Sequence, residues 1–133
     1  MRLTSTLSLT LAVAGCASGL ASAFPTPLDP RTSATVIVAR NNNLRGATRR
    51  VTLTLDGFEI AKLNVAEYVR FSVPPGTHAV GPKPHSISLN FEAGQEYFLW
   101  ISPGGVWDFE VERLQLEDGR KRMAGYRDLS QPP

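Results

Sequence analysis

The chain has 133 residues, with 14 Lys or Arg against 12 Asp or Glu and a formal net charge of +2. A length of this order fits one domain. The near balance of charge, without a cluster of basic residues interleaved with aromatic ones, argues against a nucleic-acid partner. Cys16 is the single cysteine, so no internal disulfide can form and the fold must rest on its core.

The first 23 residues have the layout of a secretory signal. Arg2 supplies a positive charge, an apolar run covers residues 7–14, and small residues follow. The run is interrupted by Ser8 and Thr10, and it is far shorter than the roughly 20 apolar residues that cross a bilayer. The pattern predicts an exported protein whose mature part has no transmembrane helix.

The end of this run carries a lipidation signal. Val13-Ala14-Gly15-Cys16 resembles the bacterial lipobox. The resemblance implies a lipoprotein signal peptide over residues 1–15, cleaved between Gly15 and Cys16, and a palmitate-type acyl anchor on Cys16. Two or three acyl chains hold a protein stably on a membrane. Ala17 stands where lipoproteins of the inner membrane tend to have Asp, which implies the outer membrane.

A second cleavage site competes with the lipobox. Ala21-Ser22-Ala23 fits the ordinary signal peptidase, which would release a soluble chain that begins at Phe24. We favour lipidation because a lone thiol in an exported protein has no disulfide partner.

Residues 16–33 are predicted to be the lipidated cysteine and a flexible tether. The segment is rich in Ala, Ser, Pro and Gly, and its three prolines favour extended backbone. Fully extended, residues 17–33 would reach on the order of 50 Å. An unstructured segment without a spacing role is the alternative.

From residue 34 to residue 126, apolar and polar residues alternate between closely spaced turns. Asp56-Gly57 is the strongest hairpin signal, because both central positions of a type I′ turn need a positive φ. Pro74-Pro75 ends a strand, since proline cannot donate to a ladder. The expected strands cover residues 35–39, 50–55, 58–63, 68–73, 77–80, 86–91, 96–102 and 106–111.

This spacing predicts an all-β fold, a seven- to eight-stranded antiparallel β-sandwich. The alternation is lost near the end of the chain. Asp118 is expected to cap a short C-terminal helix and Gly125 to end it. The sandwich domain would then cover residues 34–126, and residues 127–133 would form a tail.

Five blocks of this domain carry a family resemblance. They are Ile37-Val38-Ala39-Arg40, Val51 to Gly57, Ala66-Glu67-Tyr68, Val73 to His78, and Phe91 to Phe98. In this order they resemble a family of bacterial lipoproteins called domain of unknown function 2846. The resemblance covers residues 33–125, with Ala66 where the family commonly has Gly. It implies a transthyretin-like, immunoglobulin-like or PEGA-type β-sandwich that serves as a binding or accessory module, with no catalytic residues to carry over.

Few residues point to chemistry. His78 and His85 flank a Gly-Pro-Lys-Pro loop and could converge at one end of a hairpin, but zinc needs a third and usually a fourth ligand. Residues 108, 110 and 112 are acids that share one strand face, which is typical of a solvated face. No nucleophile motif occurs. We therefore expect no cofactor, no metal and no enzyme activity.

One aromatic group could bind a ligand or partner. Phe98 and Trp100 alternate with core positions, and Trp107 follows across a turn, so the three could form an exposed patch. The favoured alternative is that Leu114, Leu116, Met123 or Tyr126 folds over them.

Three functions remain open. The favoured hypothesis is a non-enzymatic outer-membrane lipoprotein that faces the periplasm and binds another envelope protein. The alternative is a module that binds glycan, peptidoglycan or a small ligand through Trp100, Trp107 and nearby arginines, and that is possibly secreted after cleavage at Ala23. An enzyme ranks last. Two basic groups, in residues 40–50 and 120–127, are expected to be solvated rather than bound to lipid headgroups.

Overall fold

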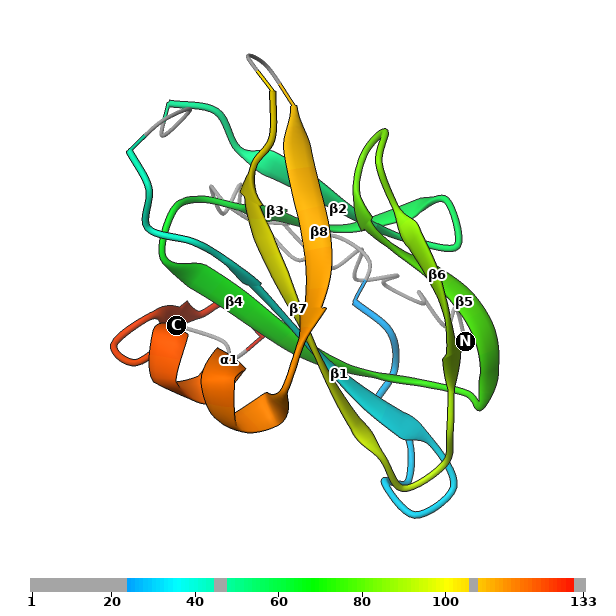
Figure 1. Ribbon diagram of the computed structural model, residues 1–133. Coiled ribbons are helices and arrows are strands. Elements are labelled where there is room, and N and C mark those ends of the chain that lie inside the picture. Colours follow the sequence, from blue (N-terminus) through cyan, green and yellow to red (C-terminus); the bar gives the residue numbers. More distant parts are fainter. Residues whose placement is uncertain (1–23, 45–47, 106–107, 131–133) are drawn as a thin grey trace, which may run out of the picture.

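Two β-sheets packed face to face, with one short helix, make up the fold (Figure 1). The computed structural model describes residues 24–44, 48–105 and 108–130. Its elements are β1 (Ala34–Arg40), β2 (Val51–Leu55), β3 (Phe58–Leu63), β4 (Glu67–Val73), β5 (Gly76–Pro82), β6 (Ile87–Phe91), β7 (Glu96–Pro103), β8 (Phe109–Leu114), α1 (Leu116–Arg122) and β9 (Arg127–Asp128).

The strand order confirms the predicted all-β sandwich with a short C-terminal helix. One sheet has the order β8-β7-β1-β4-β9 and the other has the order β3-β2-β5-β6. Most neighbours are antiparallel, but β1 pairs with β7 and β4 pairs with β9 in parallel. The described part of the chain thus has nine strands instead of seven or eight. The additional strand, β9, lies in the segment that was expected to be a tail.

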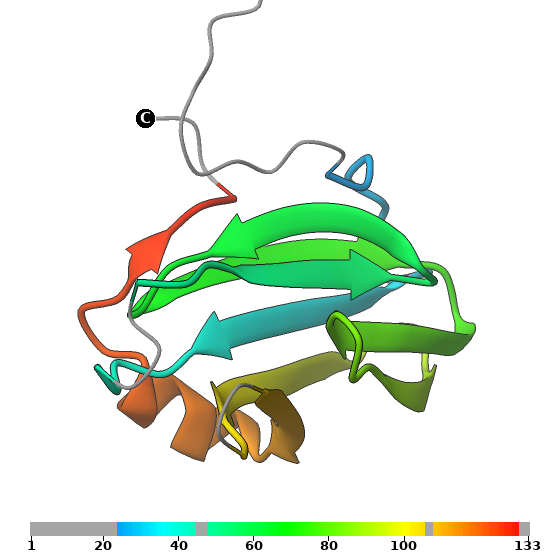
Figure 2. The same cartoon turned by 90° about the horizontal axis from the view of Figure 1, so that it is seen from above.

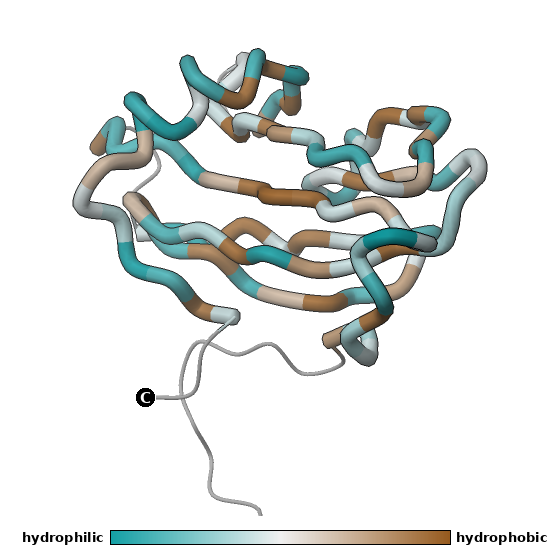
Figure 3. Tube along the Cα trace, turned by 90° about the horizontal axis from the view of Figure 1, so that it is seen from below, coloured by the Kyte–Doolittle hydropathy of each residue, from teal (hydrophilic) through white to brown (hydrophobic). Residues whose placement is uncertain are grey.

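The core follows from the period-two pattern. Val36, Val38 and Leu99 point inward from the centre of the five-stranded sheet, while Leu53 and Val80 face them from the other sheet. Hydrophilic and hydrophobic stretches accordingly alternate along the chain (Figure 3). β1 is buried on both faces, as its β-branched run predicts, because it lies in the middle of its sheet and α1 packs on the outer side.

The helix covers the outer face of the five-stranded sheet. It begins at Leu116 after Gln115, which makes no side-chain cap bond, so the predicted cap at Asp118 is wrong and Asp118 lies in the first turn. A Cβ on Gly119 would lie 2.3 Å from Cγ of Phe98, so only glycine lets the helix approach the sheet this closely. Among the described residues, no helix is long and apolar enough to cross a membrane.

The β2–β3 hairpin is the most precisely predicted element. Asp56 and Gly57 both have positive φ values, 50° and 84°, as a type I′ turn requires. The return strand begins at Phe58 and ends at Leu63, where the sequence placed it. By contrast, the last predicted strand is displaced: β8 covers residues 109–114, and residues 106–107 lie outside the described part of the chain.

The second half of the predicted tether contacts the folded domain at both of its ends. The ring of Phe24 packs edge-on against Phe71 of β4, with centroids 6.0 Å apart. Farther along, Ser33 is buried and its carbonyl accepts a hydrogen bond from the amide of Gly94. Figure 2 shows this segment (blue) and β9 (red) on one side of the molecule, with α1 (orange) on the other. Phe24 and Ser33 thus contact the domain and residues 26–32 between them are exposed, while residues 16–23 lie outside the described part.

Candidate functional site

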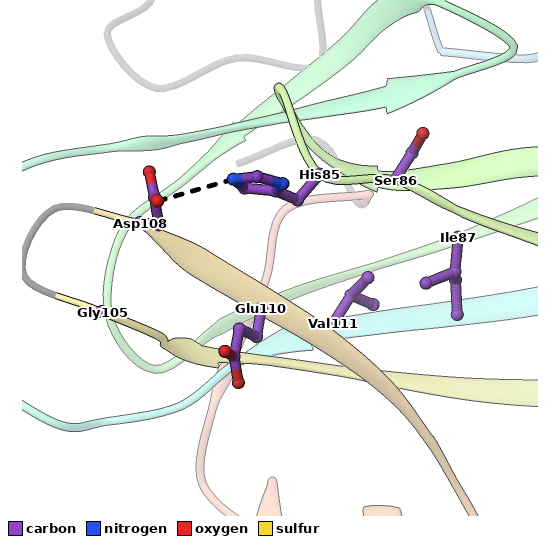
Figure 4. Close-up of a pocket in the computed structure, with 7 residues that line it drawn as sticks. All are labelled: His85, Ser86, Ile87, Gly105, Asp108, Glu110 and Val111. Carbon is purple, nitrogen blue, oxygen red and sulfur yellow. Dashed lines mark ion pairs between the residues drawn. The ribbon is translucent and has the colours of Figure 1, made fainter.

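The candidate site is the edge of the sandwich where both sheets end. β8 is the last strand of one sheet and β6 the last strand of the other, and β8 contacts β5 across the gap. A cavity of about 390 Å³ opens between them, which is near the lower end of the range for ligand pockets. We call it the edge cavity (Figure 4), and it is lined by His85, Ser86, Ile87, Gly105, Asp108, Glu110 and Val111.

The backbone of β8 presents unpaired groups at this edge. The amide of Gly104 donates to the carbonyl of Asp108 at 2.8 Å, which fixes the phase of the antiparallel β7–β8 ladder. Because hydrogen-bonded and non-bonded pairs alternate in such a ladder, Phe109, Val111 and Arg113 direct their amides and carbonyls outward. Within the described residues, no strand pairs with these groups.

The cavity combines an apolar wall with exposed polar groups. Ile87 and Val111 are half-buried and pack against the main core. His85 Nε2 lies 3.6 Å from Asp108 Oδ2, and both side chains are more than half exposed, so solvent screens this pair. Gly81 allows the two sheets to approach here, because a Cβ at this position would lie 3.1 Å from a methyl group of Val111.

The side chains at this edge include several acids and one histidine. In the ranges that the structure describes, no three His, Cys, Asp or Glu side chains are placed to hold a metal ion. Glu110 and Glu112 are exposed on β8, as the sequence predicts for a solvated face, and Glu112 lies 3.9 Å from Arg122. Among the described residues, the edge therefore carries acidic side chains, backbone groups without a strand partner and a cavity with both apolar and polar lining.

His78 does not join this site. Its Nδ1 lies 2.7 Å from Asp56 Oδ2 and its Nε2 lies 2.8 Å from the carbonyl oxygen of Pro74. These partners differ from the partner of His85, so the two histidines do not form one site. Burial raises the pKa of the Asp56 carboxyl, but bonds from His78 and from the amide of Ala79, together with the charge of His78, leave that pKa below its usual value.

The predicted aromatic patch is wrong for the two members that the structure describes. Phe98 is 0% exposed and Trp100 is 8% exposed. Tyr126 stacks on Trp100 with ring centroids 6.0 Å apart, and Arg122 approaches the same ring. The alternative is correct, because Leu114, Leu116, Met123 and Tyr126 all pack over these aromatic rings. Trp107 lies outside the described residues, as do Gly15 and Cys16.

Sequence reasoning missed a buried cation. Arg40 is 1% exposed, and its Nη1 donates to the carbonyls of Arg49 and Leu63 at 2.5 and 2.8 Å. Its guanidinium lies 4.8 Å from the ring centroid of Phe109. Desolvation lowers the pKa of Arg40, and the charge of buried Glu67 partly offsets that effect. The expectation that the basic residues in 40–50 are solvated is therefore wrong for Arg40, which continues the alternate inward positions of β1.

The late basic residues are engaged on the surface. Glu96 accepts hydrogen bonds from Arg70 at 3.1 Å and from Arg120 at 2.7 Å, and Lys121 lies 3.4 Å from Glu117. These side chains are largely exposed, except for Glu96. They are solvated ion pairs, as the sequence predicted.

No family model matches the chain, and no curated protein matches it. Among solved structures, the N-terminal domain of AlgF from P. aeruginosa is similar, with a TM-score of 0.45 and 11% identity over 66% of this chain and 100% of that domain. The resemblance to domain of unknown function 2846 stays a prediction.

Proposed function

We propose that this chain is an exported, non-enzymatic lipoprotein, held in the outer membrane by acylated Cys16, whose sandwich binds another envelope protein. The anchor rests on Val13-Ala14-Gly15-Cys16 and on the lone thiol. The observation that carries the binding role is the open edge, where the final strands of both sheets lie beside the edge cavity. Strand edges with free backbone groups are recurrent binding sites for extended segments.

The packing of Phe24 shortens the proposed tether. Seven residues separate Cys16 from Phe24, and seven extended residues reach about 25 Å. Phe24 contacts β4, next to β9, whereas β8 lies at the opposite end of the same sheet (Figure 2). A lipid on Cys16 would therefore keep the β4–β9 edge near the membrane and leave the edge cavity facing away from it.

Two measurements test the two parts of this proposal. Intact mass of the mature protein, extracted from membranes, should give a triacylated species that begins at Cys16. The Cys16→Ser variant should lack the lipid mass. An unmodified wild-type chain that begins at Phe24 would refute the anchor.

Site-specific photo-crosslinking in cells tests the binding role. A crosslinker at Ser88, on β6 beside the open edge, should give a discrete adduct with an envelope protein. The matched control is Lys62 on β3, the opposite edge of the same sheet. Equal adducts from both positions, or none from either, would contradict an interaction at the open edge.

A second candidate function is a glycan, peptidoglycan or small-ligand module, which the polar groups of the edge cavity favour. Trp100, which was expected to contact the ligand of such a module, is buried. Pelleting with purified peptidoglycan that is abolished by Asp108→Ala would favour this candidate over protein binding.

A further inference from the structure

We propose that β8 takes up an extended peptide segment in which basic and apolar residues alternate, as a strand added to the five-stranded sheet. This inference rests on the proposed function, since it names the class of partner for the same edge. Three features carry it: the backbone of β8, the charges beside it and the edge cavity.

The backbone provides the pairing. Phe109, Val111 and Arg113 turn their amides and carbonyls outward at every second position of β8. An extended peptide can pair with such a row through main-chain hydrogen bonds, which supply affinity without fixing its side chains. Selectivity must then come from the two faces of the added strand.

The outer face selects basic residues. Glu110 and Glu112 are exposed on this face of β8, opposite the inward Val111. Glu110 also lines the edge cavity, and Glu112 lies 3.9 Å from Arg122. On an added strand the residues beside them would lie about 5 Å away, where opposite charges attract and like charges repel. A second copy of β8 in antiparallel pairing would bring acids against acids. The charges therefore favour a basic segment over self-association.

The inner face selects apolar residues. Side chains between the basic positions of the added strand would point toward sheet β3-β2-β5-β6, into the edge cavity. The apolar part of its wall is half-buried Ile87 and Val111, beside the polar residues that also line it (Figure 4). A volume of about 390 Å³ admits an aliphatic side chain. His85 and Asp108 remain at the mouth of the cavity.

The test uses a fluorescent, capped seven-residue peptide of alternating Lys and Val, titrated into the mature full chain in detergent and followed by anisotropy. Three further peptides are controls: Glu in place of Lys, the same composition in blocks, and N-methylation of alternate amides. Each should bind at least about tenfold more weakly, because each removes one feature of the pairing.

Protein variants locate the site. Glu110→Lys with Glu112→Lys should weaken binding at least about tenfold, whereas Glu117→Lys, an exposed acid on α1, should leave it unchanged. Circular dichroism reports folding, and Glu110→Gln replaces the double variant if that variant misfolds. Bound peptide should slow amide hydrogen exchange at Phe109, Val111 and Arg113.

The inference fails if the block peptide binds equally, if the Lys variants bind normally, or if exchange slows elsewhere. A dimer that the peptide dissociates would instead identify a second copy as the occupant, and would overturn the proposal. Failure here together with a specific adduct from Ser88 would leave the proposed function standing, because crosslinking does not depend on the sequence of the partner.

Discussion

The two edges of the five-stranded sheet differ in what covers them. At one edge, β9 pairs with β4 and the ring of Phe24 packs on Phe71. At the other, β8 pairs with β7 on one side and with no strand of the described residues on its other side, and its outer face carries acids. Unprotected edges invite pairing with other chains, and charges restrict that pairing. The chain thus covers one edge with β9 and the segment of Phe24, and leaves the other without a second neighbouring strand among the described residues, beside exposed acids.

The C-terminal segment connects the two edges. It leaves β8, crosses the outer face of the sheet as α1 and ends as β9 on the far side. Amides of Arg127 and Leu129 donate to the carbonyls of Ala66 and Tyr68 there. The segment that forms β9 therefore also covers the aromatic residues on the outer face of the sheet. Replacing these aromatic residues should lower the stability more than any change at the open edge.

The largest effect is expected at Phe98, under the helix. Phe98→Ala should lower the free energy of unfolding by about 3–5 kcal/mol, because it empties a fully buried ring volume. Phe58, which is 75% exposed on β3, is the matched control, and its replacement by Ala should change stability by less than about 0.5 kcal/mol. Urea denaturation measures both values. Equal effects would mean that the C-terminal segment does not cover this face.

A smaller effect is expected at Gly119. Alanine favours a helix over glycine by about 1 kcal/mol, yet Gly119→Ala should destabilise the protein by about 1–3 kcal/mol because its Cβ would collide with Phe98. Lys121→Ala, on the exposed side of α1, is the control. Adding Phe98→Leu to Gly119→Ala should recover part of the loss. A stabilised Gly119→Ala protein would disprove the close contact.

The closed edge itself should respond more weakly. Phe24→Ala should cost about 1 kcal/mol, because the half-buried ring contributes part of a full side-chain burial and one edge-to-face contact. Leu28→Ala, at an exposed position in the same segment, should have little effect. Thermal unfolding of the two variants measures the difference. No loss for Phe24→Ala would restore the longer tether that the sequence suggested.

Elements that are determined by neighbouring residues could be predicted from the sequence, whereas elements that depend on distant segments could not. The Asp56-Gly57 turn was predictable because two neighbouring residues determine it. β9 was not, since Arg127 and Asp128 form a strand only beside β4. The burial of Phe98 likewise depends on a distant segment, because α1 and the residues after it pack on its face of the sheet. For the site, the 3.6 Å approach of His85 and Asp108 cannot be predicted from their spacing in the sequence, because the two residues precede strands of different sheets.

Acid should weaken the Asp56–His78 contact. The pKa of Asp56 is lowered in the folded state, so the carboxylate adds stability above its unfolded pKa, and this contribution is lost as the pH falls through the folded pKa. Asp56→Asn should cost about 0.5–1 kcal/mol at neutral pH, given the exposure of the carboxylate. Asparagine tolerates the positive φ, so the turn survives.

Denaturation at decreasing pH measures this contribution. The difference in the free energy of unfolding between Asp56→Asn and wild type should shrink below the usual carboxyl pKa of 3.8. A difference that stays constant would assign the loss to the turn instead of the charge.

The smallest effect on stability, and the most informative about the open edge, is expected from removal of its acids. Glu110→Val with Glu112→Val should change the free energy of unfolding by less than about 0.5 kcal/mol, because both side chains are exposed. The same change should cause concentration-dependent association in sedimentation velocity, since an uncharged, apolar edge can pair with another copy. Glu117→Val on α1 removes an exposed acid away from any edge and should leave the protein unassociated. Association in both variants would show that overall charge, and not the charge on β8, keeps the chains apart.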